Sequence, residues 1–190
     1  MARSNKERTE ATRLALIAAA RRLFVEKGYA ETATPDIVAE AGVTRGALYH
    51  HFEDKRALFR ATLEREAEAV AARIETISAA SGTPREALLS GASAYFDAMA
   101  EPGRTRLLLL EAPAVIGFEA MGAIERDNAE NTLERGLSDL LGPEVDAGKL
   151  QALTDLLSAA FDRAAIAIER GADRKAYEAA IADLIGGLRA

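Results

Sequence analysis

Apolar residues recur at steps of three and four along most of the chain, the spacing that predicts amphipathic helices. Four helices are expected in the N-terminal part. The first ends at Gly28, a residue suited to a left-handed helix end. A short second helix begins with Thr34 as its N-cap, and Thr44 caps a third. Asp54 caps a long fourth helix over about residues 54–79.

The same spacing continues toward the C-terminus, with boundaries at Gly, Pro or capping residues. Ala, Leu, Glu and Arg dominate these segments and favour helices, and the alternation typical of strands is missing. The pattern therefore predicts an all-α protein of about nine helices. The five helical segments expected after the fourth cover about residues 85–100, 107–110, 118–141, 146–170 and 173–188.

Composition removes several classes of function. The chain has no cysteine, which excludes disulfides, thiolate metal sites and a thiol nucleophile. The polar N-terminus lacks the apolar core of a signal peptide, and no apolar run approaches the length that crosses a bilayer. We therefore expect a cytoplasmic protein without a membrane partner.

The distribution of charge is uneven. A net charge of −6 argues against a general affinity for nucleic acid. Residues 1–60, however, carry eleven Lys and Arg against eight Asp and Glu, whereas the remainder carries thirteen against twenty-two. This asymmetry suggests a small basic module on an acidic body.

Residues 34–51 have the pattern of a helix-turn-helix, two short helices split by a tight turn and braced by the helix before them. Gly42 permits the left-handed backbone of that turn. The first short helix packs through Ile37, and the second hides Leu48 while exposing the side around Arg45. Small residues on the exposed side allow this helix to enter a DNA major groove.

A longer pattern carries a family resemblance. It runs from Gly28-Tyr29 through Ala41-Gly42-Val43-Thr44 to Tyr49-His50-His51-Phe52. Lys55 and Leu58-Phe59 continue the pattern. Together these residues resemble the DNA-binding domain of TetR-family regulators, and the resemblance covers about residues 10–65. The rest of the chain is only generically similar. One departure is Ala33, where many members carry Ser or Thr.

The resemblance implies a domain organisation and a DNA-binding face. The implied parts are a flexible basic tail (1–9), a helix-turn-helix domain (10–56) and a ligand-binding and dimerisation domain (57–190). Arg45 is expected to read guanine, with a solvated surface charge as its alternative role. Lys55 is expected to grip the DNA backbone. The implied contacts to operator DNA are Thr34, Thr44, Arg45, Gly46, Ala47, Tyr49, His50, His51 and Lys55.

The C-terminal body is expected to hold a cavity for a small, largely apolar effector, because Pro113 and Gly117 interrupt continuous helix packing. Glu111, directly after four leucines, is a candidate for a buried carboxylate that faces a ligand cation or an arginine such as Arg104. Its alternative is a solvent-exposed or capping role. The candidate lining residues, each with ordinary core packing as the alternative, are Tyr95, Met99, Leu108, Glu111, Ile116, Phe118, Met121, Asn128, Asn131 and Phe161.

The last two helices look like an association surface, because each carries an apolar stripe flanked by small alanines. The resemblance implies that two such pairs form a four-helix dimer interface. A monomer that hides these stripes internally is the alternative. The predicted interface residues are Leu153, Leu157, Phe161, Ala164, Ile168, Tyr177, Ile181, Leu184 and Leu188.

The prediction that follows is a homodimeric repressor that a small molecule releases from a palindromic operator. No catalytic set converges in the body, which lacks His and Cys, and neither a cofactor nor a metal site is expected. Three alternatives stay open. One is an activator that binds DNA in the same way, another is a DNA-binding protein without a ligand response, and the most remote is a helical enzyme.

Overall fold

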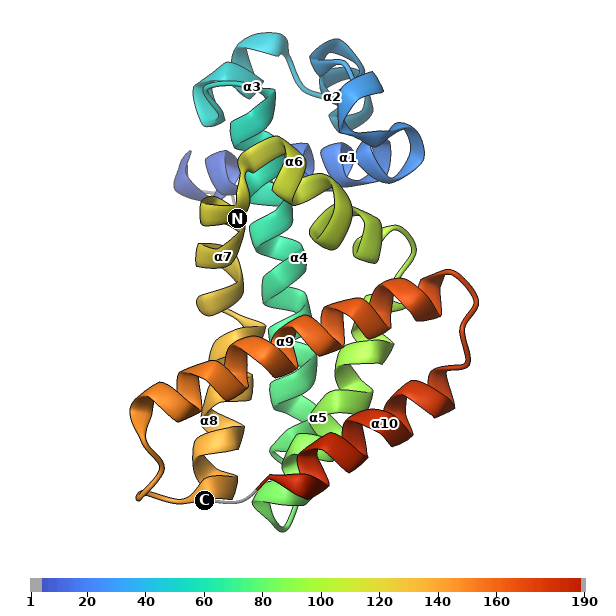
Figure 1. Cartoon of the computed structure of the whole chain (residues 1–190). Coiled ribbons are helices and arrows are strands. Elements are labelled where there is room, and N and C mark those ends of the chain that lie inside the picture. The colour runs from blue at the N-terminus through green and yellow to red at the C-terminus, as the bar shows by residue number, and fades with distance from the viewer. Residues whose placement is uncertain (1–4, 189–190) are drawn as a thin grey trace.

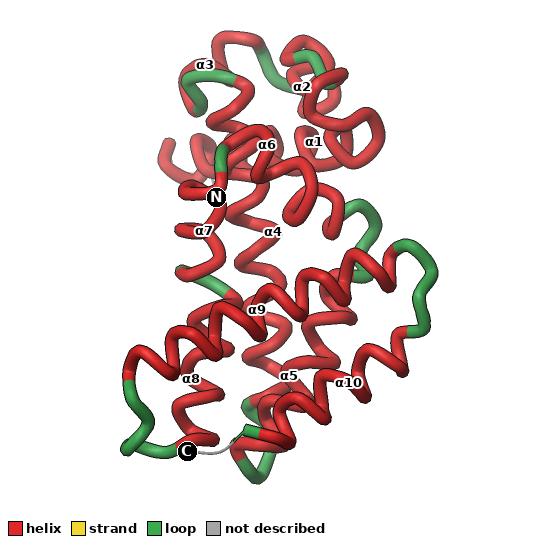
Figure 2. Tube along the Cα trace, viewed as in Figure 1, coloured by secondary structure: helices red, strands yellow, loops and turns green. Residues whose placement is uncertain are grey.

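The computed structural model describes residues 5–188, and Figures 1 and 2 show that this part of the chain is helical throughout. It has ten α-helices and one π-helical segment, η1. In order they are α1 (Asn5–Glu31), α2 (Thr34–Ala41), α3 (Arg45–His51), α4 (Lys55–Ser78), α5 (Pro84–Met99), η1 (Arg106–Glu111), α6 (Ala112–Ile116), α7 (Phe118–Arg126), α8 (Ala129–Leu141), α9 (Ala147–Glu169) and α10 (Arg174–Gly187).

The helices form a small unit joined to a larger body. Figure 1 shows α2 and α3 at one end with α1 beneath them, and α4 running from that end into the body. Helices α9 and α10 cross the opposite half of the molecule (Figure 1). One connected set of buried apolar residues extends through both parts. The small unit and the body are therefore packed on a shared helix, α4.

Several predicted helix starts are confirmed by their hydrogen bonds. The Thr44 hydroxyl accepts from the backbone N–H of Ala47 (3.2 Å), and the Asp54 carboxylate accepts from the N–H of Ala57 (2.7 Å). The predicted cap at Thr34 is wrong. The N-cap of α2 is Ala33, whose backbone is extended (φ −93°, ψ 144°), and Thr34 is the first residue of the helix.

The predicted count of nine helices is close, and the difference has a local cause. The helix expected over 118–141 is divided into α7 and α8, since Asn128 leaves helical geometry (φ −129°, ψ −113°). Its side-chain amide donates to the carbonyl of Ile124 (2.7 Å) and so takes an acceptor at the end of α7.

The tail predicted over 1–9 also changes. Residues 1–4 lie outside the described residues. Residues 5–9 belong to the start of α1, so this part of the predicted tail is helical.

Aromatic and ionic contacts join α1 to α4. Phe24 packs edge-on against Phe59 with ring centroids 4.9 Å apart, and Tyr29 lies 4.8 Å from the same ring. Deeper in the body, the buried carboxylate of Glu66 accepts from Arg21 and Arg104, each at 2.9 Å. Arg104 therefore forms its ion pair with Glu66 and not with Glu111. These contacts fix how α1 sits on α4.

Candidate nucleic-acid interface and interior cavity

Helix α3 presents one side to its own domain and the other to solvent. Leu48 is completely buried against the unit that also buries Ile37, as the pattern predicted. Arg45, Gly46 and His50 are exposed. The exposed face lies at the end of the molecule farthest from α9 and α10 (Figure 1). Nothing in the described protomer covers this face, so it is free to enter a groove.

Three of the predicted contact residues gather on this face. The Arg45 guanidinium lies 5.4 Å from the centre of the Tyr49 ring, a cation–π distance. The Tyr49 side chain is 45% exposed. Hydrogen bonding with Thr34, and then with Arg45, lowers the pKa of the Tyr49 hydroxyl. A polar patch made of Thr34, Arg45 and Tyr49 therefore spans the outer edges of α2 and α3.

The two histidines have different surroundings. His50 is exposed, whereas His51 is half-buried. Burial, then the charges of His50 and Arg13, lower the pKa of His51, while the charge of Glu10 raises it. His51 thus lies close to α1, and His50 is the more accessible of the pair. Within residues 5–188, no group of three or more His, Cys, Asp and Glu is placed to hold a metal ion.

Lys55 has a different role from the predicted DNA-backbone contact. Its ammonium donates to the carbonyls of Tyr29 (2.8 Å), Thr32 (3.0 Å) and Ala30 (3.4 Å). It also lies 4.3 Å from the centre of the Tyr29 ring. A protonated lysine has three donors, so these carbonyls occupy all of them. Lys55 fixes the end of α1 against the start of α4.

The predicted ligand contact at Glu111 is wrong, because its carboxylate faces the DNA-binding unit. It accepts from the backbone N–H of Tyr29 (2.9 Å) and lies 3.1 Å from Nε of Arg106, an ion pair without hydrogen-bond geometry. Arg106 also donates to the carbonyls of Phe24 (2.7 Å) and Val25 (2.6 Å). Both ends of η1 therefore bind the C-terminal part of α1, which we call the η1–α1 contact.

A second connection runs from α6 to α4. The Arg56 guanidinium donates to the carbonyls of Val115 (3.1 Å) and Ile116 (3.0 Å). Arg56 follows Lys55 directly, so neighbouring residues at the start of α4 bind α1 and α6. Together with the bonds of Glu66 to Arg21 and Arg104, these two contacts tie the small unit to the body.

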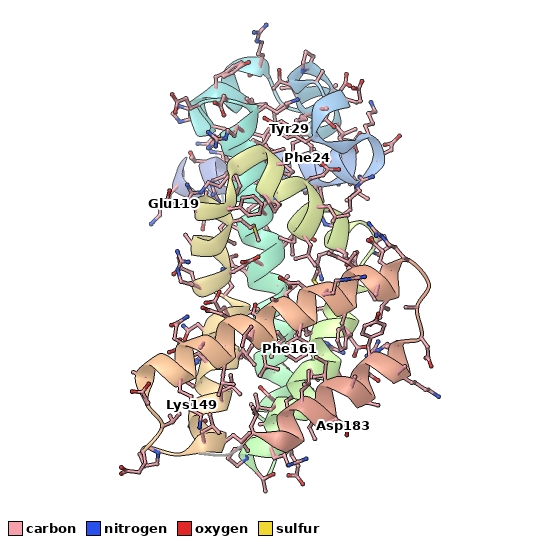
Figure 3. The ribbon with its side chains drawn as sticks, viewed as in Figure 1. Phe24, Tyr29, Glu119, Lys149, Phe161 and Asp183 are labelled. Carbon is pink, nitrogen blue, oxygen red and sulfur yellow. The ribbon has the colours of Figure 1, made fainter. Side chains whose placement is uncertain are left out.

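The body contains a cavity of about 530 Å³. Its walls come from α4, α5, η1, α7, α8 and α9, and most of the lining side chains are apolar. Tyr95 and Phe161 form an aromatic wall with ring centroids 5.5 Å apart. Figure 3 labels Phe161 at the middle of α9. The predicted residues that line the cavity are Tyr95, Met99, Leu108, Met121, Asn128 and Phe161.

The other predicted lining residues lie elsewhere. Phe118 is 82% exposed at the start of α7, directly after the positive-φ Gly117. Asn131 is exposed because it lies on the solvent side of α8, whose Leu133 and Gly136 face the cavity. Ile116 is buried outside the cavity at the end of α6.

The sequence analysis missed the charged groups of the cavity. Glu125 and Asp162 line it, and the Tyr95 hydroxyl donates to the Asp162 carboxylate (2.7 Å). Burial, then the charges of Asp162 and Glu130, raise the pKa of Glu125 to about 7. Burial also raises the pKa of Asp162, and the bond from Tyr95 opposes that shift. A sequence signal existed at Asp162, an acid directly after the apolar run Leu156–Phe161 broken only by Ser158.

The predicted dimer stripe largely faces inward. Leu157, Phe161, Ala164 and Ile181 are buried in the protomer, so they are corrected to core residues. Leu153, Ile168, Tyr177 and Leu188 are half-buried, and Leu184 is exposed. The outer face of α9 and α10 instead presents Leu156, 70% exposed, and Leu184, 53% exposed. Both sides of α9 are apolar, so the pattern alone did not separate its core positions from its surface positions.

Comparison with known proteins accounts for this arrangement. A model of the tetR family of bacterial regulatory proteins matches residues 16–62. A model described as the tetracyclin repressor-like C-terminal domain matches residues 85–189, more than half of the chain. The chain belongs to the TetR family. It is therefore a DNA-binding transcription regulator and not an enzyme.

Individual TetR-family relatives differ in how much they share. TtgR, an HTH-type transcriptional regulator from Pseudomonas putida, is 47% identical over 64 residues, which make up 34% of this chain and 30% of TtgR. A TetR-family regulator from Pectobacterium atrosepticum is 32% identical, with a TM-score of 0.71 over 97% of this chain and 94% of that one. FadR from Bacillus subtilis, solved with stearoyl-CoA, shares the fold (18% identity, TM-score 0.74, coverage 90% and 96%).

Among the described helices, none is both long and apolar enough to span a membrane.

Proposed function

We propose that the chain is a homodimeric repressor that inserts α3 into the major groove of its operator and leaves it when a small molecule fills the cavity. The observation that carries the DNA-binding part is the two-sided burial of α3. Leu48 anchors the helix, while Arg45 and Tyr49 are exposed on its outer side, next to the half-buried Thr34 of α2. The other proposed contacts are Thr44, Gly46, Ala47 and His50, with His51 beside them.

The proposed roles follow from the chemistry of each group. The Arg45 guanidinium matches O6 and N7 of guanine as a bidentate donor. Thr34 and Thr44, near helix N-termini, suit phosphate oxygens. Gly46 and Ala47 present little bulk, so the helix can approach the base edges closely. Lys55 contributes indirectly, since it holds the ends of α1 and α4 together.

The cavity supports the proposal of an effector. It has about 530 Å³ of space and mostly apolar walls, which are usual properties of a small-molecule site. FadR, which shares the fold, was solved with stearoyl-CoA. We therefore assign residues 57–190 to ligand binding and dimerisation and residues 10–56 to DNA binding.

The proposed release couples the cavity to α1. Leu108 and Leu109 of η1 line the cavity, and Arg106 and Glu111 of the same segment make the η1–α1 contact. A ligand that fits better when η1 is displaced shifts the population toward a form in which α1 and α3 are reoriented. Operator affinity then falls by the difference in ligand affinity between the two forms.

Dimerisation is proposed through α9 and α10. Exposed Leu156 and Leu184, with exposed Ala159 and Ala180 beside them, form a face of small and apolar residues. A two-fold interface on this face would present two α3 helices to one duplex, roughly 34–36 Å apart for adjacent major grooves. Such a dimer reads a palindromic operator, and its place of action is the cytoplasm.

The test replaces Arg45 with Ala and measures binding to DNA from upstream of the gene by fluorescence anisotropy. We expect a loss of roughly 1–3 kcal/mol and a relaxed preference at one base pair per half-site. Arg73→Ala is the matched control, because Arg73 is exposed on α4 and pairs at 3.8 Å with Asp97 of the body. Equal affinity and base preference in Arg45→Ala and the unaltered protein would remove α3 as the reading helix.

A further inference from the structure

The cavity has a strongly acidic lining. Five acidic residues contribute to its walls, against a single arginine among the lining residues: Glu75, Glu125, Glu130, Asp139 and Asp162 against Arg135. That arginine is already bound, since Arg135 lies 2.7 Å from Glu75 in an ion pair at the rim. Glu75 and Asp139 are exposed, whereas Glu125, Glu130 and Asp162 are half-buried, and burying carboxylates without partners is unfavourable.

The three half-buried carboxylates of the cavity, Glu125, Glu130 and Asp162, form no ion pair within the described residues. Within residues 5–188, the side chains of Glu125 and Glu130 make no hydrogen bond or ion pair, and Asp162 accepts only from the Tyr95 hydroxyl. The charge of Arg126 acts on Glu125 and Glu130, but Arg126 is exposed and does not line the cavity.

The charges of Asp162 and Glu130 act on Glu125 from two other helices. Glu125 is on α7, Glu130 on α8 and Asp162 on α9. Burial and the charges of the other two raise the pKa of Glu125 to about 7. A positive group placed among them would remove this repulsion and favour the ionised form of all three.

The remaining wall suits the body of an amphiphilic molecule. Tyr95 and Phe161 present aromatic rings beside Asp162, and Met99, Leu108 and Met121 complete an apolar surface. Aromatic faces attract cations, and the apolar surface accepts a hydrocarbon body. An anionic ligand would meet like charge on α7, α8 and α9.

We infer that the effector of this cavity is a lipophilic organic cation, whose positive group lies between Glu125 and Asp162 and whose apolar body packs on Tyr95 and Phe161. This inference rests on the proposed function and names the ligand class of the same cavity. The acidic groups then set ligand selectivity, while the apolar walls supply most of the contact area.

The experiment uses three probes with one hydrocarbon chain and different charge. Decyltrimethylammonium, 1-decanol and decanoate are titrated into the full-length protein by calorimetry, the two ions below their micelle concentrations and the alcohol below its solubility. We expect the cation to bind at least tenfold more tightly than the alcohol and the anion to bind most weakly. Decanoate or decanol binding as tightly as the cation would overturn the inference, whatever any variant does.

Variants then locate the charge. Glu125→Gln and Asp162→Asn keep the shape of each side chain, and each should weaken cation binding about tenfold while leaving decanol binding unchanged. Glu119→Gln is the matched control, because Glu119 is an exposed residue on the same helix and lies outside the cavity (Figure 3). Cation affinity that is equal in Glu125→Gln, Asp162→Asn and the control would also overturn the inference.

Operator release by the same probes separates this inference from the proposed function. Decanoate that binds as tightly as the cation and releases the operator would overturn the cation class and leave the regulator mechanism intact. Cation binding that depends on Glu125 but leaves the operator bound would support the ligand class and overturn ligand release.

Discussion

Replacing Glu125 with Gln should stabilise the unliganded protein at alkaline pH. The pKa of Glu125 is raised from 4.5 to about 7, first by burial and then by the charges of Asp162 and Glu130, while Arg126 opposes the shift. An acid whose pKa is raised in the folded state keeps its proton up to a higher pH when folded than when unfolded. The protein therefore loses stability as the pH rises from about 4.5 through about 7. Gln carries no charge at any pH and avoids this loss.

The size of the effect follows from the shift. One pKa unit corresponds to about 1.4 kcal/mol, so the shift from 4.5 to about 7 corresponds to about 3.4 kcal/mol at pH 8. Water that enters the cavity screens part of this interaction, and we expect about 2 kcal/mol. At pH 5 most of the penalty is absent, and the gain should fall below about 1 kcal/mol. For a chain of this size, about 2 kcal/mol raises Tm by roughly 4–8 °C.

The assay is thermal unfolding followed by circular dichroism at pH 5 and pH 8, at one protein concentration because a dimer's Tm depends on it. Glu119→Gln, on the exposed side of the same helix, controls for a general effect of Gln on α7. A gain in Glu125→Gln that is the same at both pH values, or absent at pH 8, would refute the reasoning.

Three further changes test other contacts. Glu66→Gln should lower the free energy of unfolding in urea by about 2–4 kcal/mol, because it leaves two arginines without their carboxylate. Burial raises the pKa of Glu66, but the two arginines outweigh burial and lower it, so the cost should shrink below about pH 4.5. Gly103→Ala should cost about 1–3 kcal/mol by the same assay, because φ is +75° and its Cβ would lie 2.6 Å from Val25. Glu111→Ala should still bind the operator in anisotropy, but decyltrimethylammonium should release the operator less well from this variant. Full release would argue against a role of the η1–α1 contact in release.

The elements with local signals were predictable from the sequence. Thr44 and Asp54 cap helices through bonds to residues three positions later, so the signal and its partner lie within one turn. The buried and exposed sides of α3 followed from the position of Leu48 in a seven-residue helix. For these elements, the local sequence contained the whole determinant.

The determinants that were missed involve distant partners or two similar helix faces. Glu111 bonds to Tyr29, a residue 82 positions away, and nothing in the sequence around either residue indicates that meeting. On α9, Leu156 and Leu157 are both apolar, and tertiary packing alone decides that Leu157 is buried and Leu156 exposed. The charged cavity was missed for a related reason, since Glu125, Glu130 and Asp162 come together only after three helices have packed.

In the proposed release, η1 is the segment through which a ligand would influence DNA binding without touching the DNA-binding unit. This six-residue segment presents Leu108 to the cavity and Arg106 and Glu111 to α1. Its π-helical backbone has wider turns than an α-helix, an arrangement that often occurs at functional sites. In the proposed release, a ligand that displaces the backbone of η1 breaks the η1–α1 contact or moves α1 with it. Both outcomes change the position of α3, since α3 packs on α1.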